Sequence, residues 1–547
     1  MRQEAYDTTG RLTTIISASG QRLLFSYSTA STPNTTAPGV GYLIGVNDSL
    51  GRSVMFFYNS LGQVAQISVP TGNFQKMEYV AGNLAKITWA DLSARTFAYN
   101  NAALPWALTG VFDESSVLVA SFAYDSQGRA VSTERAGGVD RHSVTYATPP
   151  SIVVTDTFSP ADGVIYRVRS WQTALAPSVT MPNGSALDLG VALVANSPAV
   201  TTRSQPAGSG CSASTSGQSY DVNGNVASRD DFNGYRTCYA NDLSRNLETT
   251  RVEGLAGGAS CAVTAAGTAL PAGARKINTQ WHPDWSLAIK QAEPGRITIS
   301  VYNGQPDPFA GGAVASCAPT SATLPDGKPT VVLCRQVDQA TTDADGSQGF
   351  AAQPQAGVAA REQRWAYNQF GQVLSSIDPR GNVTTYSYYA DTAFSGADPN
   401  AVGHTMGDLQ SMTNPAGHVT QYTQYNKTGQ VLTMIDPNGI VTSNTYDARQ
   451  RLTSTAVGGQ ASSYEYWPTG LLKKATQPDG SYLSYGYDDA HRLVQVSDNL
   501  GNNITYTLDN SGNRTAETVK DAGGSLRSQL SRSIDALGRV QQVTGRP

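Results

Sequence analysis

The stretch that decides the fold is Tyr124-Asp125-Ser126-Gln127-Gly128-Arg129, because its pattern of an aromatic residue followed by a turn returns at a nearly constant interval. In the C-terminal part the equivalent residues lie 21, 20 and 21 positions apart, at Tyr425, Tyr446, Tyr466 and Tyr487. In the N-terminal part they are Tyr58, Tyr79, Tyr99, Tyr124 and Tyr146. An internal repeat of about 21 residues therefore runs through both ends of the chain.

Each repeat carries two turn signals. The first places Asp or Asn after the aromatic residue and Gly three positions later, and the second lies half a repeat on and adds Pro, as in Asp436-Pro437-Asn438-Gly439. This order favours a type I turn, in which the Asp side chain bonds the backbone two residues on. The Gly accepts the left-handed conformation that completes a hairpin loop with a bulge.

The short runs between the turns alternate as strands do. Leu483, Tyr485 and Tyr487 share one face of such a strand. Each repeat of about 21 residues therefore predicts two strands, and successive repeats predict one long antiparallel meander in an all-β fold. Because open twisted sheets rarely exceed about 10 strands without curling, we expect the meander to wind into a spiral or a partial hollow shell. Each repeat then contacts mainly its neighbours.

One segment also fits a helix, with Leu526, Leu530, Ile534 and Leu537 spaced 4, 4 and 3 residues apart. Because Ile534-Asp535-Ala536-Leu537-Gly538-Arg539 matches the repeat turn with Ile in place of Tyr, we favour strands here.

The overall composition narrows the class of protein. The 547 residues include 38 Lys and Arg against 42 Asp and Glu, a net charge of −4 that disfavours nucleic-acid binding. No run reaches the roughly 18 apolar residues of a membrane span. The N-terminus lacks the apolar region of a signal peptide. We expect a protein that is secreted or displayed at the cell surface by a route without a cleavable signal. The alternatives are a protein that stays inside the cell, cytoplasmic before delivery, and a fragment.

The repeat resembles the Rhs (YD-repeat) family, on the matches Tyr6-Asp7-x-x-Gly10-Arg11, Tyr124-Asp125-x-x-Gly128-Arg129, Tyr446-Asp447-x-x-x-Arg451-Leu452 and Tyr487-Asp488-x-x-x-Arg492-Leu493. The resemblance implies a bacterial protein whose repeats form a hollow β-shell around a C-terminal toxin. It also implies delivery between cells by a secretion apparatus. Carbohydrate binding has been ascribed to such repeats, and related repeats occur in eukaryotic adhesion proteins.

The sequence departs from this family pattern in two ways. It shows no delivery module before the repeats and no cargo of distinct composition after them, so we expect a fragment or one piece of a split system. Family members cleave themselves at a DPxGL-type motif. Asn382 follows Asp378-Pro379-Arg380-Gly381 and Ile440 follows Gly439, so we expect no self-cleavage.

Three regions follow from the repeats. Residues 1–149 and 361–547 are predicted to be regular repeat sheet, whereas residues 150–360 are atypical and loop-rich. We interpret this middle region as long loops inserted into the same shell. The alternative is a separate small domain that plugs or braces the shell.

All five cysteines lie in the middle region, without C-x-x-C or a Cys/His cluster, so we expect no metal site. Cys317 and Cys334 flank the turn at residues 324–327 and are predicted to form a disulfide across a hairpin. Cys211 and Cys238 could pair likewise, which leaves one thiol over. Free buried thiols are the alternative.

Aromatic side chains supply the candidate contacts with a glycan or a cargo. The densest cluster contains Trp281 and Trp285, which either stack on a sugar or pack under a loop. A second set lies on the repeat strands, at Tyr386, Tyr464, Tyr485 and Tyr506. A shell should turn these tyrosines mostly inward, whereas an adhesin should show them on its outside.

The sequence predicts no enzyme and no cofactor. Its five histidines lie in different repeats, and no nucleophile, phosphate-binding or zinc-protease motif occurs. Our first hypothesis is a structural part of a shell that encloses and shields a toxin or another polypeptide, with a secretion apparatus engaged through missing modules. The alternative is a surface module that binds carbohydrate or neighbouring cells.

Overall fold

The computed structural model describes residues 3–146, 152–159, 164–171, 177–396, 398 and 401–546. The first part of the chain forms β1 (Gln3–Tyr6), β2 (Leu12–Ile16), β3 (Arg22–Tyr27), β4 (Leu43–Asp48), β5 (Ser53–Tyr58), β6 (Val64–Ser68), β7 (Phe74–Val80), β8 (Asn83–Trp89), β9 (Ala94–Ala98), β10 (Gly110–Phe112), β11 (Leu118–Tyr124), β12 (Ala130–Arg135), the 3-10 helix η1 (Ala136–Gly138) and β13 (His142–Thr145).

The middle part forms β14 (Ile152–Ser159), β15 (Val164–Trp171), β16 (Ser178–Thr180), β17 (Ala186–Val194), β18 (Ser197–Gln205), β19 (Ser214–Tyr220), β20 (Val226–Asp230), β21 (Tyr235–Asp242), β22 (Leu247–Ala256), β23 (Arg275–Trp281), β24 (Ala288–Glu293), β25 (Arg296–Tyr302) and β26 (Leu333–Ala340). Three short 3-10 helices lie in its loops, η2 (Cys261–Thr264), η3 (Pro308–Ala310) and η4 (Gly349–Ala351).

The last part forms β27 (Arg361–Tyr367), β28 (Val373–Ile377), β29 (Val383–Tyr388), β30 (Ala393–Phe394), β31 (Gly403–His404), β32 (Leu409–Thr413), β33 (Val419–Tyr425), β34 (Val431–Ile435), β35 (Val441–Tyr446), β36 (Leu452–Val457), β37 (Gln460–Tyr466), β38 (Leu472–Thr476), β39 (Tyr482–Tyr487), β40 (Leu493–Asp498), β41 (Asn503–Leu508), β42 (Arg514–Lys520), β43 (Leu526–Ile534) and β44 (Val540–Arg546).

One sheet contains 42 of the strands in the described part of the chain, and β14 and β15 pair only with each other. Strands adjacent in the sequence pair antiparallel, and the ladder passes from β13 to β16 and from β29 to β32. The predicted all-β meander is therefore confirmed. Residues 526–534 form a strand, which rules out the helical alternative.

The hairpins have the predicted turn geometry. In the first repeat the N–H of Asp7 donates to the carbonyl of Arg11, and the N–H of Gly10 donates to the carbonyl of Asp7. Gly10 has φ +81°, in the left-handed region. The register slips between Ala5 and Tyr6, because β2 carries one extra residue, Thr13, opposite the repeat tyrosine.

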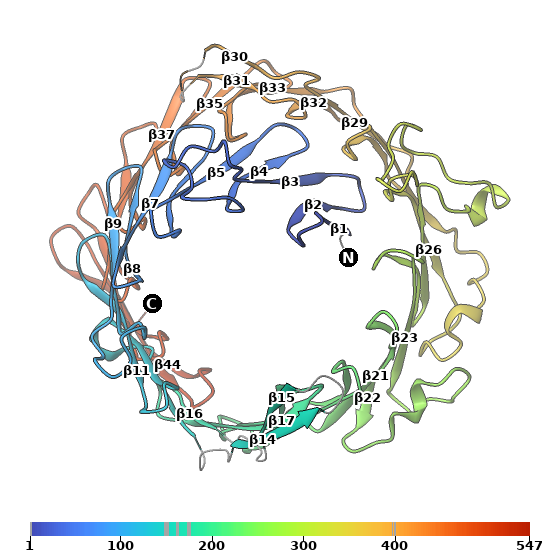
Figure 1. Cartoon of the computed structure of the whole chain (residues 1–547), viewed down its shortest axis with the longest axis horizontal. Coiled ribbons are helices and arrows are strands. Elements are labelled where there is room, and N and C mark those ends of the chain that lie inside the picture. The colour runs from blue at the N-terminus through green and yellow to red at the C-terminus, as the bar shows by residue number, and fades with distance from the viewer. Residues whose placement is uncertain are drawn as a thin grey trace.

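The ribbon curves into a ring and continues past one full turn (Figure 1). The blue N-terminal strands β3, β4 and β5 lie inside the orange strands β29 to β35. The fold is thus a spiral wall around an open centre, not a closed barrel.

The middle region adds a second layer to this wall. Figure 1 shows its green and yellow loops on the outer side of the ring. The loop that contains η2 packs on the wall in a cluster of Cys238, Val252, Leu255 and Ala274. The loop that contains η4 brings Ala352 onto neighbouring strands. Two of the buried clusters therefore lie between the wall and its outer loops.

Candidate functional site: the wall and its seam

The wall is built from one local motif, in which Asp holds the turn and the following Arg. The Oδ1 atom of Asp7 accepts hydrogen bonds from the N–H groups of Thr9 and Arg11, at 2.8 and 3.0 Å. Its Oδ2 atom accepts from Nε of Arg11 at 2.8 Å. The Thr9 hydroxyl and the Arg11 N–H lower the pKa of Asp7 far below its usual value. The same Asp–Arg pair recurs at Asp125–Arg129, Asp447–Arg451, Asp488–Arg492 and Asp535–Arg539.

The repeat tyrosine joins this motif to the next repeat. The hydroxyl of Tyr27 donates to the carbonyl of Leu12 at 2.8 Å, and the Arg11 guanidinium lies 5.1 Å from the Tyr27 ring centre. Tyr146 bonds the carbonyl of Ala130 in the same way, under Arg129. These two tyrosines thus connect neighbouring strands by a hydrogen bond and by a cation–π contact.

The chain also contacts itself along a seam between its two windings, where hydrogen bonds join residues 313 to 378 positions apart. Arg52 pairs with Asp408, and the Nε2 atom of His491 lies 2.8 Å from Oδ2 of Asp113. The other polar contacts include Arg449–Glu114, Arg451–Asp91, Asp140–Asn510, Arg135–Ala490 and Arg539–Ser209. Hairpin turns of the second winding therefore rest on turns at one edge of the first.

The most buried ion pairs of the seam centre on Glu114. Its side chain is fully buried and lies 3.2 Å from Arg95 and 3.5 Å from Arg449. Both guanidinium groups also face the Trp89 ring, at 5.7 and 4.4 Å from its centre. One carboxylate thus links two cations from different windings.

At the seam, Asp113 is the acidic partner of His491. Burial alone would raise the pKa of Asp113, but the hydrogen bonds from His491 and from the N–H groups of Val117 and Ser115 outweigh burial and lower it. The carboxylate is therefore held in its charged form at the seam.

Two disulfides fix the middle region, and one of them differs from the sequence-based pairing. Cys317 and Cys334 are bonded, with their Cα atoms 5.4 Å apart. The pairing of Cys211 with Cys238 is wrong, because Cys238 is bonded to Cys261 and Cys211 is free. The loop after β22 folds back over β21 and brings Cys261 onto Cys238, and nothing in the local sequence indicates this return.

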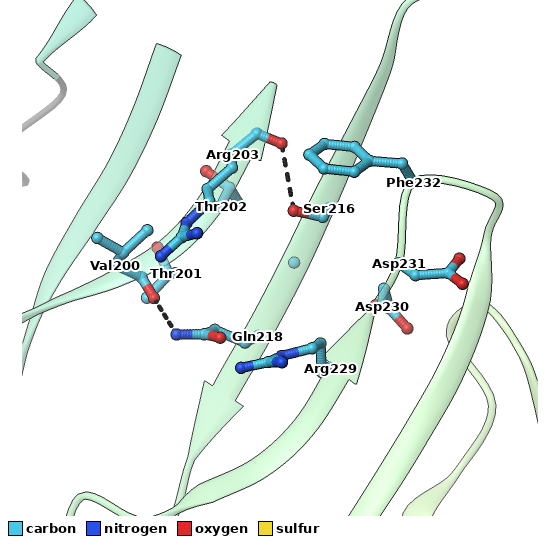
Figure 2. A pocket seen from close by; sticks show the side chains of 11 residues that line it. Val200, Thr201, Thr202, Arg203, Ser216, Gln218, Arg229, Asp230, Asp231 and Phe232 are labelled. Atoms are coloured by element: carbon cyan, nitrogen blue, oxygen red, sulfur yellow. Dashed lines mark hydrogen bonds between the residues drawn. The ribbon is translucent and has the colours of Figure 1, made fainter. Parts of the chain in front are cut away.

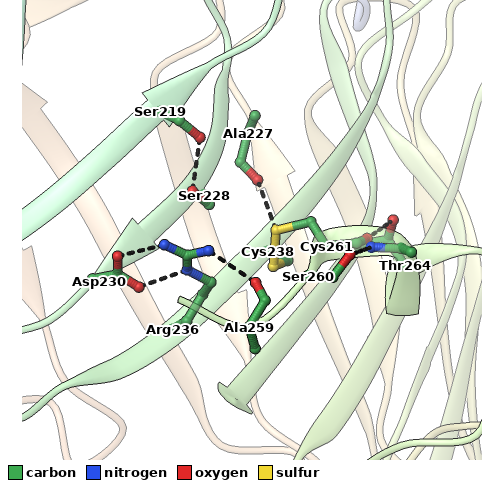
Figure 3. Close-up of a disulfide and its surroundings, with 11 residues drawn as sticks. Ser219, Ala227, Ser228, Asp230, Arg236, Cys238, Ala259, Ser260, Cys261 and Thr264 are labelled. Carbon is green, nitrogen blue, oxygen red and sulfur yellow. Dashed lines mark hydrogen bonds and ion pairs between the residues drawn. A yellow bond between two sulfur atoms is a disulfide. The ribbon is translucent and has the colours of Figure 1, made fainter. Parts of the chain in front are cut away.

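Figure 3 shows how this second disulfide is supported. Arg236 forms two bonds to the carboxylate of Asp230, at 2.7 and 2.6 Å. It also donates to the carbonyl of Ala259 at 2.8 Å, at the start of the loop. The buried Lys276 donates to two carbonyls of the same loop, and burial lowers its pKa. No sequence signal indicated this polar support, because the loop carbonyls that Arg236 and Lys276 bind lie 11 to 23 residues away from them.

The aromatic candidates lie in different places. Trp285 is only 2% exposed and packs with Ile16, Tyr302, Leu324 and Val331, so its proposed role as a surface contact is wrong. Trp281 is half-buried and donates its indole N–H to the carbonyl of Glu248. The four repeat tyrosines are all half-buried, at Tyr386, Tyr464, Tyr485 and Tyr506. Trp285 lies in the loop between β23 and β24, the other five residues lie on separate strands, and the six do not form one cluster.

No group of three or more His, Cys, Asp or Glu side chains in the described residues is arranged to hold a metal ion. Across the same residues, no helix has the length and apolar character needed to cross a membrane.

Comparison with known proteins identifies the repeat and the fold. A family model described as RHS Repeat matches residues 407–441, 425–462, 466–502 and 487–525. A stretch of 121 residues is 30% identical to the double-stranded DNA deaminase toxin A of Burkholderia cenocepacia (strain H111), and it covers 22% of this chain and 8% of that protein.

Two solved structures share the fold. The TcdB2-TccC3-Cdc42 structure superimposes with a TM-score of 0.56 and 12% identity, over 97% of this chain and 26% of that one. The TcdB2-TccC3 structure without its hypervariable C-terminal region gives a TM-score of 0.54 and 12% identity, over 99% of this chain and 26% of that one. This chain therefore spans about a quarter of those chains and less than a tenth of the deaminase toxin.

Proposed function

We propose, from the premise that this chain is an Rhs (YD-repeat) family protein, that its wall forms part of a shell that encloses and shields a toxin or another polypeptide for delivery between cells. The observation that carries the proposal is the seam. A ribbon that merely curved would leave a slit between its windings, whereas ion pairs and backbone hydrogen bonds join these windings along their edges. A joined wall can keep proteases away from what lies inside it.

Two further observations support this proposal. The backbone of the wall winds around a centre that no described strand crosses (Figure 1), as an enclosing shell requires. One relative that shares part of the repeat sequence is itself named as a toxin.

Protection from protease tests the proposal directly. An unstructured reporter segment with several trypsin sites is fused to the C-terminus of the chain, and the same reporter is fused to a compact β-sandwich domain as a control. Shielding predicts that trypsin cuts the reporter roughly tenfold more slowly in the shell fusion, since cleavage follows the population in which the segment is accessible.

A variant weakened at the seam completes the design. Glu114→Gln should restore faster cleavage of the reporter, because it removes the carboxylate that links Arg95 and Arg449. Equal cleavage rates in the shell fusion and the β-sandwich fusion would refute the proposal.

A further inference from the structure

A small pocket lies on the face of the wall opposite to the outer loops. Ser228 of β20 pairs with Cys238, so it shares the face on which the η2 loop packs. Arg229 is the next residue and therefore points to the other face. Its partner across the ladder is Gln218 of β19.

The second basic residue of the pocket reaches the same face from β18. Ser216 lies two residues before Gln218 in β19 and pairs with Arg203. Residues two apart in a strand share a face, and so do paired residues. Arg203 and Arg229 therefore project from the inner face of the wall, one strand apart on either side of β19.

Figure 2 shows both guanidinium groups on one side of the pocket, with the Gln218 side chain between them and the Phe232 ring at the opposite rim. The cavity measures about 240 Å³. The Gln218 amide is held in place because it donates to the carbonyl of Val200 at 2.8 Å. The space suits one side chain better than a whole small ligand, which needs roughly 300 Å³ or more.

The two guanidinium groups have no acidic partner among the described residues. Asp230 and Asp231 also line the pocket, but neither pairs with these two arginines. Asp230 forms its ion pair with Arg236 on the outer face, and Oδ1 of Asp231 accepts the N–H groups of Asn233 and Tyr235 in the adjacent turn. Planar guanidinium groups match carboxylates in geometry and charge.

We propose that this pocket binds a carboxylate side chain from an acidic segment of the enclosed polypeptide. This inference rests on the proposed shell function, because only an enclosed chain would meet the inner face. Electrostatic attraction by the chain as a whole does not explain the binding of an acidic segment, because the chain has a net charge of −4 and repels acidic partners. An acidic sugar offers the same carboxylate, and the experiment below separates the two.

The test measures binding of a fluorescein-labelled hexaglutamate peptide to the full chain by fluorescence anisotropy. The double variant R203Q/R229Q should bind the peptide at least about tenfold more weakly, the usual effect of losing hydrogen bonds between charged groups. The control variant R22Q/R361Q removes two exposed arginines that also lack ion pairs among the described residues. It should bind the peptide as the unchanged chain does.

Four outcomes would overturn the inference: no peptide binding by the unchanged chain, equal affinity in R203Q/R229Q, an equal loss in both double variants, or tighter binding of oligogalacturonate than of the peptide. Because both arginines are exposed and unpaired, R203Q/R229Q should keep the melting temperature of the unchanged chain. A neutral reporter that stays protected from trypsin while the peptide fails to bind would remove this inference and leave the shell function standing.

Discussion

Replacement of Glu114 by Gln tests whether the seam stabilises the wall. The substitution keeps the shape of the side chain but leaves Arg95 and Arg449 without the carboxylate that they share. Loss of one partner from a buried ion pair costs about 3–5 kcal/mol. Because the two arginine side chains are 34% and 14% exposed, water replaces part of this interaction. We therefore expect a cost of about 2 kcal/mol, roughly a 25-fold change in the local opening equilibrium.

Hydrogen exchange measures this opening one segment at a time, because amide exchange reports local unfolding as well as global unfolding. Exchange should accelerate in the turns at residues 113–117 and 447–451 and stay unchanged in β25, far along the wall. The matched control is Glu78→Gln, which removes an exposed pair with Lys86 and should cost less than about 0.5 kcal/mol. If the two variants exchange alike, the seam contributes no stability and the reasoning fails.

Three other predictions concern the repeat motif and the thiols. Tyr425→Phe removes a hydrogen bond of 2.6 Å to the carbonyl of Leu409 from a buried ring, and it should cost about 1 kcal/mol in thermal or denaturant unfolding; an unchanged midpoint would contradict this. The pKa values of Asp7 and Asp535 in the folded chain lie below the unfolded value near 3.9. The stability that these two turns contribute is therefore fully present above about pH 4, and it is lost as the pH falls through the folded-state pKa values. Circular dichroism should therefore show acid unfolding only below about pH 4, and a transition above about pH 5 would argue against this. Alkylation of the denatured, unreduced protein should label one thiol, at Cys211, and mass spectrometry that finds three or five labels would contradict the two disulfides.

The parts of the fold that the sequence predicted are those that depend on contacts between residues close together in the chain. In the first repeat, Asp7 and Gly10 fix a hairpin turn through contacts within five residues, so the spacing of such turns reveals every strand between them. The sequence showed the repeat tyrosine only as a residue that returns at a regular interval, without indicating what its hydroxyl binds. The hydroxyl of Tyr27, for example, donates to the carbonyl of Leu12, which lies 15 residues earlier in the chain. No rule of hairpin chemistry identifies that carbonyl in advance.

The seam and the second disulfide lay beyond sequence reasoning for a different reason. The pairing of His491 with Asp113 depends on how many residues complete one winding of the wall. That number is set by the small twist between neighbouring strands, added up over many strands. The bond between Cys238 and Cys261 depends on a loop that returns over its own sheet. Neither the number of residues in one winding nor the path of that loop is indicated by residues close together in the sequence.

A wall of one sheet cannot bury both of its faces, and this explains where the buried residues are. Several fully buried side chains lie where outer loops add a second layer, as with Val252 and Leu255, while the regular repeats keep side chains such as Tyr464 and Tyr485 half-buried. The regular repeats must therefore draw their stability from the strand ladder and from the Asp–Arg–Tyr motif.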